Sequence, residues 1–162
     1  MKKNIVLICL NDYLLKQVSA DLVKKLKANW LDIDGAVENE LLRSKGDKLH
    51  IANEFLTSLE RKIISQAVTE ENTIFSISPE MFLANSNKEY FHECSCIYLA
   101  TETHSIDILQ IKNKAEKTRI IQNATINSNL NEFLINSCEY VIQNADIKEI
   151  ADLVKEIKAL IK

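Results

Sequence analysis

Short buried segments alternate with helical segments along most of this chain, and this alternation limits the folds that it can adopt. Strands that are joined by helices run parallel, and helices then cover both faces of the sheet. The sequence therefore predicts one domain, residues 1–162, with a three-layer α/β/α sandwich. We expect a five-stranded parallel sheet with the strands Ile5–Cys9, Trp30–Asp32, Thr73–Ile77, Ser95–Ala100 and Tyr140–Gln143.

Helix boundaries are predicted by apolar periodicity and by residues that cap helices. Apolar residues have helical spacing from Leu14 to Lys27 and from Ile51 to Val68. Pro79, the only proline, is expected to begin a short helix. Asp146 and Glu149 have the spacing of a capping box, so we expect the last helix to begin there.

The turn after the first strand lies where a phosphate-binding loop would be expected in such a layout, but its residues do not suit phosphate. Such a loop needs glycines, whose backbone N–H groups wrap the phosphates, and a Lys followed by Ser or Thr. Residues 9–17 contain no glycine, and Asp12 adds a negative charge. The sequence therefore predicts a nucleotide-kinase type of architecture without its nucleotide site.

Composition excludes several classes of function. The net charge is −3, and only Arg43, Arg61 and Arg119 are arginines, so nothing indicates binding to nucleic acid or to an anionic membrane. No apolar run approaches the roughly 20 residues that span a bilayer. We expect a cytoplasmic protein that is a monomer or a weak oligomer, with no nucleic-acid or membrane partner.

The cysteines allow two interpretations. His92, Cys94 and Cys96 alternate, so on a strand they would share one face and could bind a metal. The usual Cys-x-x-Cys spacing is missing, and Cys138 is distant in sequence. The interpretation that we prefer is that Cys94 and Cys96 are small core residues in a reduced state.

Five segments, in order and at the expected spacing, resemble the shikimate kinase family over almost the whole chain. The resemblance implies a P-loop nucleoside/shikimate kinase-like fold and an ATP-dependent phosphotransferase as the ancestral activity. The segments that carry it are Asn4-Ile5-Val6-Leu7-Ile8, Leu31-Asp32-Ile33-Asp34, Phe55 to Ile64 with Glu60, Cys96-Ile97-Tyr98-Leu99 and Cys138-Glu139-Tyr140-Val141-Ile142.

Most functional residues that the resemblance implies are replaced in this chain, which amounts to a degenerate Walker A motif. The glycines of the phosphate loop fall on Cys9, Asp12 and Leu14, its lysine on Leu15 and its Mg²⁺-binding hydroxyl on Lys16. Other replacements affect the substrate arginine, the triple-glycine turn after the third strand and the last substrate arginine. These fall on Thr57, on residues 76–79 and near Leu130.

Two carboxylates survive from the family pattern. The resemblance assigns Asp32 to Mg²⁺ and Asp34 to a substrate hydroxyl or to proton transfer. The alternative for this pair is a strand end followed by an aspartate that caps the next helix. The resemblance also places a lid at about residues 112–131, where Arg119 is the only arginine that could bind substrate.

Two hypotheses about function follow. The first is a catalytically inactive shikimate kinase-like pseudoenzyme, with no cofactor, that binds another protein or a small molecule. The alternative is a small-molecule kinase with a rebuilt site that uses Asp32, Asp34, Lys16 and Arg119, with ATP and Mg²⁺. Under the first hypothesis, we expect apolar side chains of this chain to fill the nucleotide groove, namely Leu14, Leu15 and Ile120 or Ile121.

Overall fold

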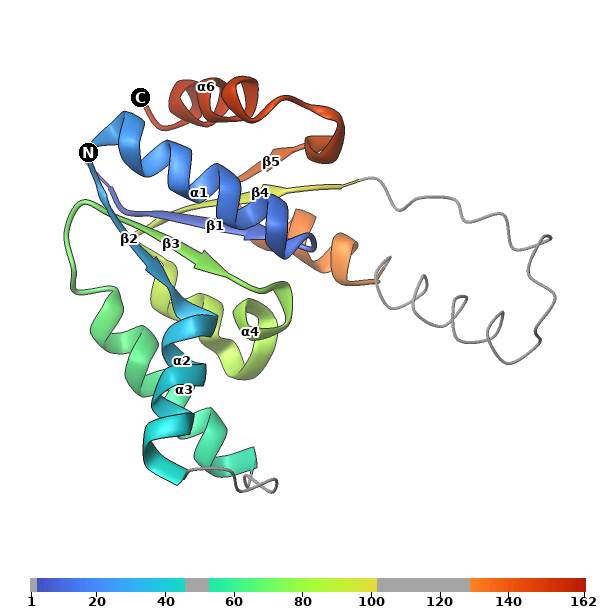
Figure 1. Ribbon diagram of the computed structural model, residues 1–162. Coiled ribbons are helices and arrows are strands. Elements are labelled where there is room, and N and C mark those ends of the chain that lie inside the picture. Colours follow the sequence, from blue (N-terminus) through green and yellow to red (C-terminus); the bar gives the residue numbers. More distant parts are fainter. Residues whose placement is uncertain (1–2, 46–52, 102–128) are drawn as a thin grey trace, which may run out of the picture.

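The computed structural model describes residues 3–45, 53–101 and 129–162, and these form one sheet between two layers of helices (Figure 1). The strand order is β2-β3-β1-β4-β5, and every neighbouring pair is parallel. This confirms the predicted fold class. The strands are β1 (Ile5–Cys9), β2 (Asn29–Asp32), β3 (Thr73–Ile77), β4 (Ser95–Leu99) and β5 (Tyr140–Ile142).

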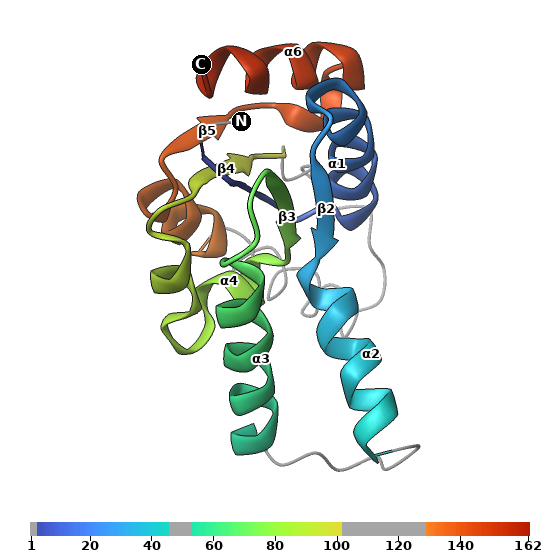
Figure 2. The same cartoon turned by 90° about the vertical axis from the view of Figure 1, so that its left-hand side faces the viewer.

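Helices cover both faces of the sheet, as Figures 1 and 2 show. α1 (Asp12–Leu26) and α6 (Ile150–Leu160) lie on one face. The other face carries α3 (Asn53–Ala67), α4 (Pro79–Leu83), the 3₁₀ helix η1 (Ala84–Phe91) and helical residues 129–137. α2 (Ile33–Lys45) extends from the end of β2 alongside α3, and the short 3₁₀ helix η3 (Ala145–Ile147) precedes α6.

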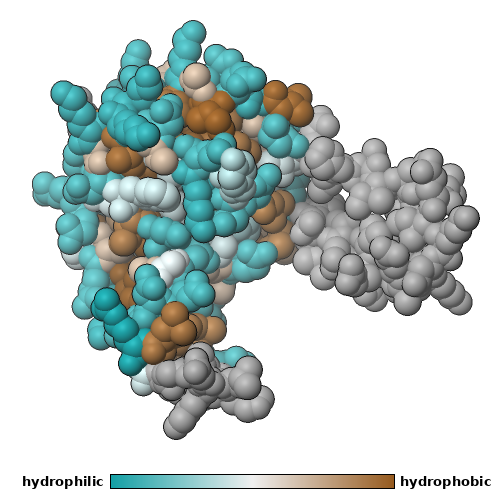
Figure 3. Space-filling view, viewed as in Figure 1, coloured by the Kyte–Doolittle hydropathy of each residue, from teal (hydrophilic) through white to brown (hydrophobic). Residues whose placement is uncertain are grey.

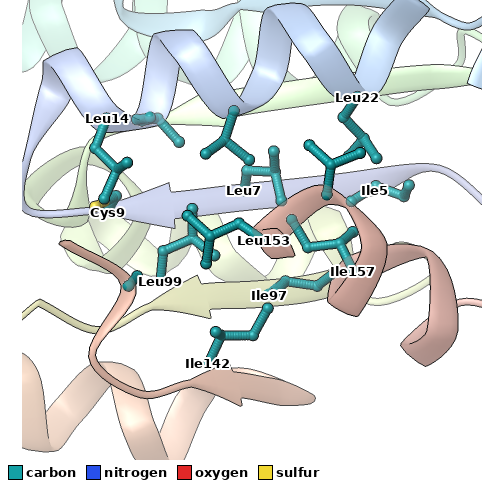
Figure 4. Packing of buried hydrophobic residues seen from close by; sticks show 14 of the residues in the cluster. Ile5, Leu7, Cys9, Leu14, Leu22, Ile97, Leu99, Ile142, Leu153 and Ile157 are labelled. Atoms are coloured by element: carbon teal, nitrogen blue, oxygen red, sulfur yellow. The ribbon is translucent and has the colours of Figure 1, made fainter. Parts of the chain in front are cut away.

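Alternate residues of the strands supply two separate hydrophobic cores, as the period of a β-strand requires. Leu7 and its alternate neighbours pack against α1 and α6, and Figure 4 shows Leu22, Leu153 and Ile157 facing them. Val6 and its alternate neighbours pack against α3, α4 and η1. β1, β3 and β4 are buried along their whole length, which explains their nearly continuous apolar sequences.

The surface is mostly hydrophilic on the face shown in Figure 3, where hydrophobic residues gather in small separate areas. In the part of the chain that the structure describes, no helix is both long enough and apolar enough to cross a membrane.

The predicted capping box is wrong. The N-cap of α6 is Glu149, and its side chain makes no capping hydrogen bond. Asp146 instead lies within η3, four residues before α6 begins. The extra turn arises because Asn144 is left-handed, with φ 55°, and because the amide of Ala145 donates to the carbonyl of Ala100. This hydrogen bond holds the chain at the end of β4, so the helix begins later.

Candidate functional site

The turn that follows β1 is closed by its own residues. Only Leu10 and Asn11 separate β1 from α1, which begins at Asp12. Asn11 is the N-cap, and its Oδ1 accepts the amide of Leu14 at 3.0 Å, while its carbonyl accepts the amide of Leu15 at 3.0 Å. These amides are therefore satisfied within the helix and its cap. The capping role of Asn11 was not predicted, although an Asn directly before a helical pattern is an N-cap signal.

Leu14 and Leu15, which fall on a glycine and the lysine of the family's phosphate loop, are core residues. Leu15 is only 3% exposed, and both leucines belong to the core between the sheet, α1 and α6. Figure 4 shows Leu14 beside Cys9 at the end of β1. The first turn of α1 therefore presents apolar side chains to the interior.

Lys16 lies between carboxylates from two elements. Its Nζ is 2.9 Å from Asp12 Oδ2 in the same helix and 3.9 Å from Asp32 Oδ2 at the end of β2. The hydrogen bond that the Lys16 ammonium donates to Asp12 raises the pKa of Lys16, and the charges of Asp12, Asp32 and Asp34 act in the same direction. The structure thus brings Lys16, Asp32 and Asp34 together at the carboxyl edge of the sheet, as the alternative hypothesis requires.

Asp32 caps α2. Its Oδ1 accepts the amide of Gly35 at 3.2 Å, and β2 ends at Asp32 because the helix begins at the next residue. Gly35 suits this cap, since an added Cβ would lie 2.9 Å from Asp32 Oδ2. The strand thus ends at Asp32 as predicted, and the capping role considered for this pair of carboxylates holds for Asp32.

Asp34, in the first turn of α2, is bound to the turn that follows β3. Its Oδ2 accepts the amide of Ser78 at 2.7 Å, and its Oδ1 accepts the Ser78 hydroxyl at 2.5 Å. Ser78 in turn caps α4, and its Oγ accepts the amide of Met81. Residues 76–79 stand where the family has a triple-glycine turn, so this carboxylate now holds α2, β3 and α4 together. The role of Ser78 was not predicted, because its partner Asp34 is 44 residues away in the sequence.

Thr57, which stands at the position of the family's substrate arginine, contacts another part of the chain. Thr57 Oγ1 accepts a hydrogen bond of 3.3 Å from Asn85 Nδ2, and Arg61 Nη2 donates to the carbonyl of Asn85 at 3.5 Å. One turn away, buried Glu60 accepts a hydrogen bond from buried Asn87 at 3.3 Å. These residues of α3 therefore position η1, whose role no sequence signal indicated.

Some predicted site residues lie outside the described residues. These are Arg119, Ile120 and Ile121, together with residues 112–128 of the proposed lid segment. The end of that segment, residues 129–131, is helical, and the Asn131 side chain accepts the buried Tyr98 hydroxyl at 2.7 Å.

The alternative of a metal site at His92, Cys94 and Cys96 is wrong. β4 begins only at Ser95, so His92 is not on a strand, and its side chain is exposed beside Glu93. Cys94 and Cys96 are buried free thiols, as the preferred interpretation expected. Among the described residues, no group of three or more His, Cys, Asp or Glu side chains could hold a metal ion.

The buried thiols predict a loss of stability in alkaline solution. Burial raises the pKa of Cys9 to about 11 and that of Cys96 to about 12, from 9.0. Thiols of the unfolded chain therefore ionise first, so stability that is fully present below pH 9.0 is lost as the pH rises through the folded pKa values. We expect each such thiol to cost roughly 1 kcal/mol by about pH 10 in urea unfolding.

A matched variant separates this effect from other titrations. Cys9→Ala is less stable near neutral pH, but its free energy of unfolding should fall less steeply with pH than that of the parent protein. Equal slopes for the two proteins would contradict a role for the Cys9 thiol.

The fold and the order of these elements define a P-loop kinase type of α/β protein. A sequence profile described as "Shikimate kinase" matches residues 17–161. The chain therefore belongs to the shikimate kinase family. The matched region begins at Gln17, directly after the turn and the first residues of α1. No curated protein sequence matches the chain.

Solved structures of shikimate kinases share this fold across nearly the whole chain. The enzyme from Bacteroides thetaiotaomicron has a TM-score of 0.69 at 16% identity, with 98% of each chain covered. The enzyme from Acinetobacter baumannii, solved in complex with shikimate, has a TM-score of 0.66 at 18% identity, with 98% of this chain and 92% of that chain covered. The enzyme from Aquifex aeolicus has a TM-score of 0.69 at 14% identity, with 96% and 94% covered.

Proposed function

We propose that this member of the shikimate kinase family does not transfer phosphoryl groups and that it acts by binding another protein or a small molecule. The observation that carries the proposal is the start of α1 at Asp12. Residues 12–15, which would belong to the phosphate loop, instead form the capped first turn of α1. Leu15, which replaces the phosphate-binding lysine, is buried. Backbone amides that are bonded to Asn11 are not available to phosphate.

The residues at this edge do not fit Mg-ATP. Asp12 places a carboxylate where phosphate would approach, and the position of the Mg²⁺-binding hydroxyl is Lys16. Asp32 already accepts the amide of Gly35, and both oxygens of Asp34 are bonded to Ser78. Asp32 and Asp34, the carboxylates that survive from the family pattern, are therefore engaged within the described part of the protein.

The free-energy cost of losing the phosphate loop favours a complete loss of catalysis over a weakened kinase. Phosphoryl transfer depends almost entirely on positioning and on electrostatic stabilisation of the transferred group. Removing a single preorganised transition-state donor costs about 3–4 kcal/mol. Loss of the loop amides and of the lysine together leaves little of the rate enhancement that a kinase needs.

One observation favours the alternative of a kinase with a rebuilt site. Lys16 Nζ lies 3.9 Å from Asp32, so a cation and two carboxylates do meet at the carboxyl edge of the sheet. The closer partner of Lys16 is Asp12, at 2.9 Å, and this surface pair must separate before the ammonium could reach a phosphate. The alternative therefore depends on a rearrangement that the first proposal does not need.

A turnover assay distinguishes the two proposals. Purified protein with Mg-ATP and shikimate should release no ADP above the rate of a protein-free control. Lys16→Ala and Asp34→Asn serve as matched variants, because both would lower any activity that a rebuilt site produces. Shikimate-dependent ADP release that these variants abolish would establish the alternative.

Equilibrium dialysis with shikimate alone tests the kind of partner. We expect no saturable binding, because Thr57 stands at the position of the carboxylate-binding arginine and is bonded to Asn85. Saturable binding without turnover would instead show that the family's substrate is the small molecule.

A further inference from the structure

A cavity of about 420 Å³ lies beside β2, on the face of the sheet that α3 covers. α2 and α3 contact each other on this side, and Figure 2 shows both helices below β2. The cavity is bordered by Asn29 and Thr73, the first residues of β2 and β3, so it extends toward the amino ends of these strands. Its lining therefore differs from that of the candidate site at the carboxyl edge of the sheet.

The walls of this cavity are mostly apolar. Leu31 of β2, Ala36 of α2 and Ile63 of α3 line it, and all three are only half-buried. Small-molecule sites are typically apolar cavities of roughly 300–1,000 Å³ with a few polar groups that orient the ligand. An apolar group that covers these three side chains removes their remaining surface from water, which favours binding.

β2 presents main-chain groups to the cavity. The Trp30 indole points to the opposite face of the sheet, where its Nε1 donates to Ser76 Oγ at 3.0 Å. The amide of Asn29 donates toward β3, to the carbonyl of Asn72, so the N–H and C=O of Trp30 face outward. No strand within residues 3–45, 53–101 and 129–162 lies on the outer side of β2. The carbonyl of Trp30 is thus an acceptor that a ligand can reach.

The charge at the rim of the cavity is negative. Among the described residues that line it, Glu70 is the only charged one, and none of the ion pairs in that part of the chain involves it. α3 also ends at the cavity, which Gln66 and Ala67 line. Its last turn has no basic residue, whereas those of α1 and α6 do. The partial negative charge of this helix end therefore adds to that of Glu70.

We propose that this cavity binds a small organic cation, namely a primary amine attached to one aromatic ring. The ring packs on Leu31 and Ile63, and the ammonium group lies at the rim beside Glu70 and the end of α3. The inference goes beyond the proposed function, because the cavity is not lined by the residues that replace the phosphate loop. Binding here is measured without ATP, so its outcome is independent of whether phosphoryl transfer is lost.

Titration with phenethylamine, followed by NMR of the backbone amides, tests the proposal. We expect saturable chemical-shift changes at Leu31, Ala36 and Ile63, with a dissociation constant in the millimolar range or below. Phenylacetate has the same ring with a carboxylate, so it should bind much more weakly. Equal binding of the two probes, or no change at these amides, would overturn the proposal. Shifts that depend on protein concentration alone would also overturn it, because they would assign the cavity to a second copy of the chain.

Two variants and one control locate the site. Glu70→Gln keeps the shape of an exposed side chain and should raise the dissociation constant for phenethylamine about fivefold. Ala36→Phe puts a ring into the cavity and should abolish binding, with thermal unfolding as the check that the variant is folded. Glu71→Gln removes the neighbouring carboxylate, which does not line this cavity, and should leave the affinity nearly unchanged. Equal effects of Glu70→Gln and Glu71→Gln would contradict a specific contact with Glu70.

Discussion

Replacing Leu15 with lysine is expected to destabilise the protein by about 3 kcal/mol, although it restores the lysine of the family's phosphate loop. Leu15 is 3% exposed and packs in the core between the sheet, α1 and α6. The substitution removes buried apolar contacts and forces an ammonium group either into that core or outward past its neighbours. Urea unfolding measures the loss.

A matched control lies two positions earlier in the same helix. Tyr13 is 71% exposed, so Tyr13→Lys should change the free energy of unfolding by no more than about 0.5 kcal/mol. Both variants add one positive charge to the first turn of α1, and only the buried position should be sensitive. A Leu15→Lys protein that keeps its stability and gains affinity for ATP would contradict the assignment of this position to the core.

Removing the carboxylate of Asp34 is expected to cost about 2–3 kcal/mol of stability. Asp34→Ala leaves the amide and the hydroxyl of Ser78 without their acceptor, and hydrogen bonds to a charged group are among the stronger ones. The loss should appear as a lower midpoint in urea unfolding. It should also weaken the contact that holds α4 next to α2. A carboxylate that served only a substrate could be removed with little effect on stability.

Asp12→Ala is the matched control for this prediction. Asp12 and Lys16 form an exposed pair within one helix, so its removal should cost no more than about 1 kcal/mol. A double-mutant cycle of Asp34→Ala with Ser78→Ala then isolates the contact itself, and we expect non-additive losses because the two side chains bond directly. Additive losses would contradict a direct structural role for Asp34.

The layers of the fold were predictable because strand and helix periodicities are local properties of the sequence. Buried central strands such as β1 and β4 appear as continuous apolar segments, and Leu14 and Leu15 have the helical spacing of a core-facing stripe. The loss of glycines from residues 9–17 likewise needs no structure to be seen.

The roles of polar side chains were harder to predict because their partners are distant in sequence. Asp34 was considered for substrate binding, and nothing in its own neighbourhood indicates Ser78, which is 44 residues away. The failed capping box has the same cause, since the contact between Ala145 and Ala100 decides where α6 begins. The His92, Cys94 and Cys96 pattern failed because it assumed a strand that begins three residues later.

The central proposal is that this chain has lost the nucleotide site of its family, and isothermal titration with Mg-ATP tests it most directly. The account predicts no saturable heat up to sub-millimolar ATP, because the amides of Leu14 and Leu15 are bonded to Asn11 and Asp12 repels phosphate. The Tyr13→Lys variant should behave in the same way. A saturable isotherm with a micromolar dissociation constant would contradict the account and restore the kinase with a rebuilt site.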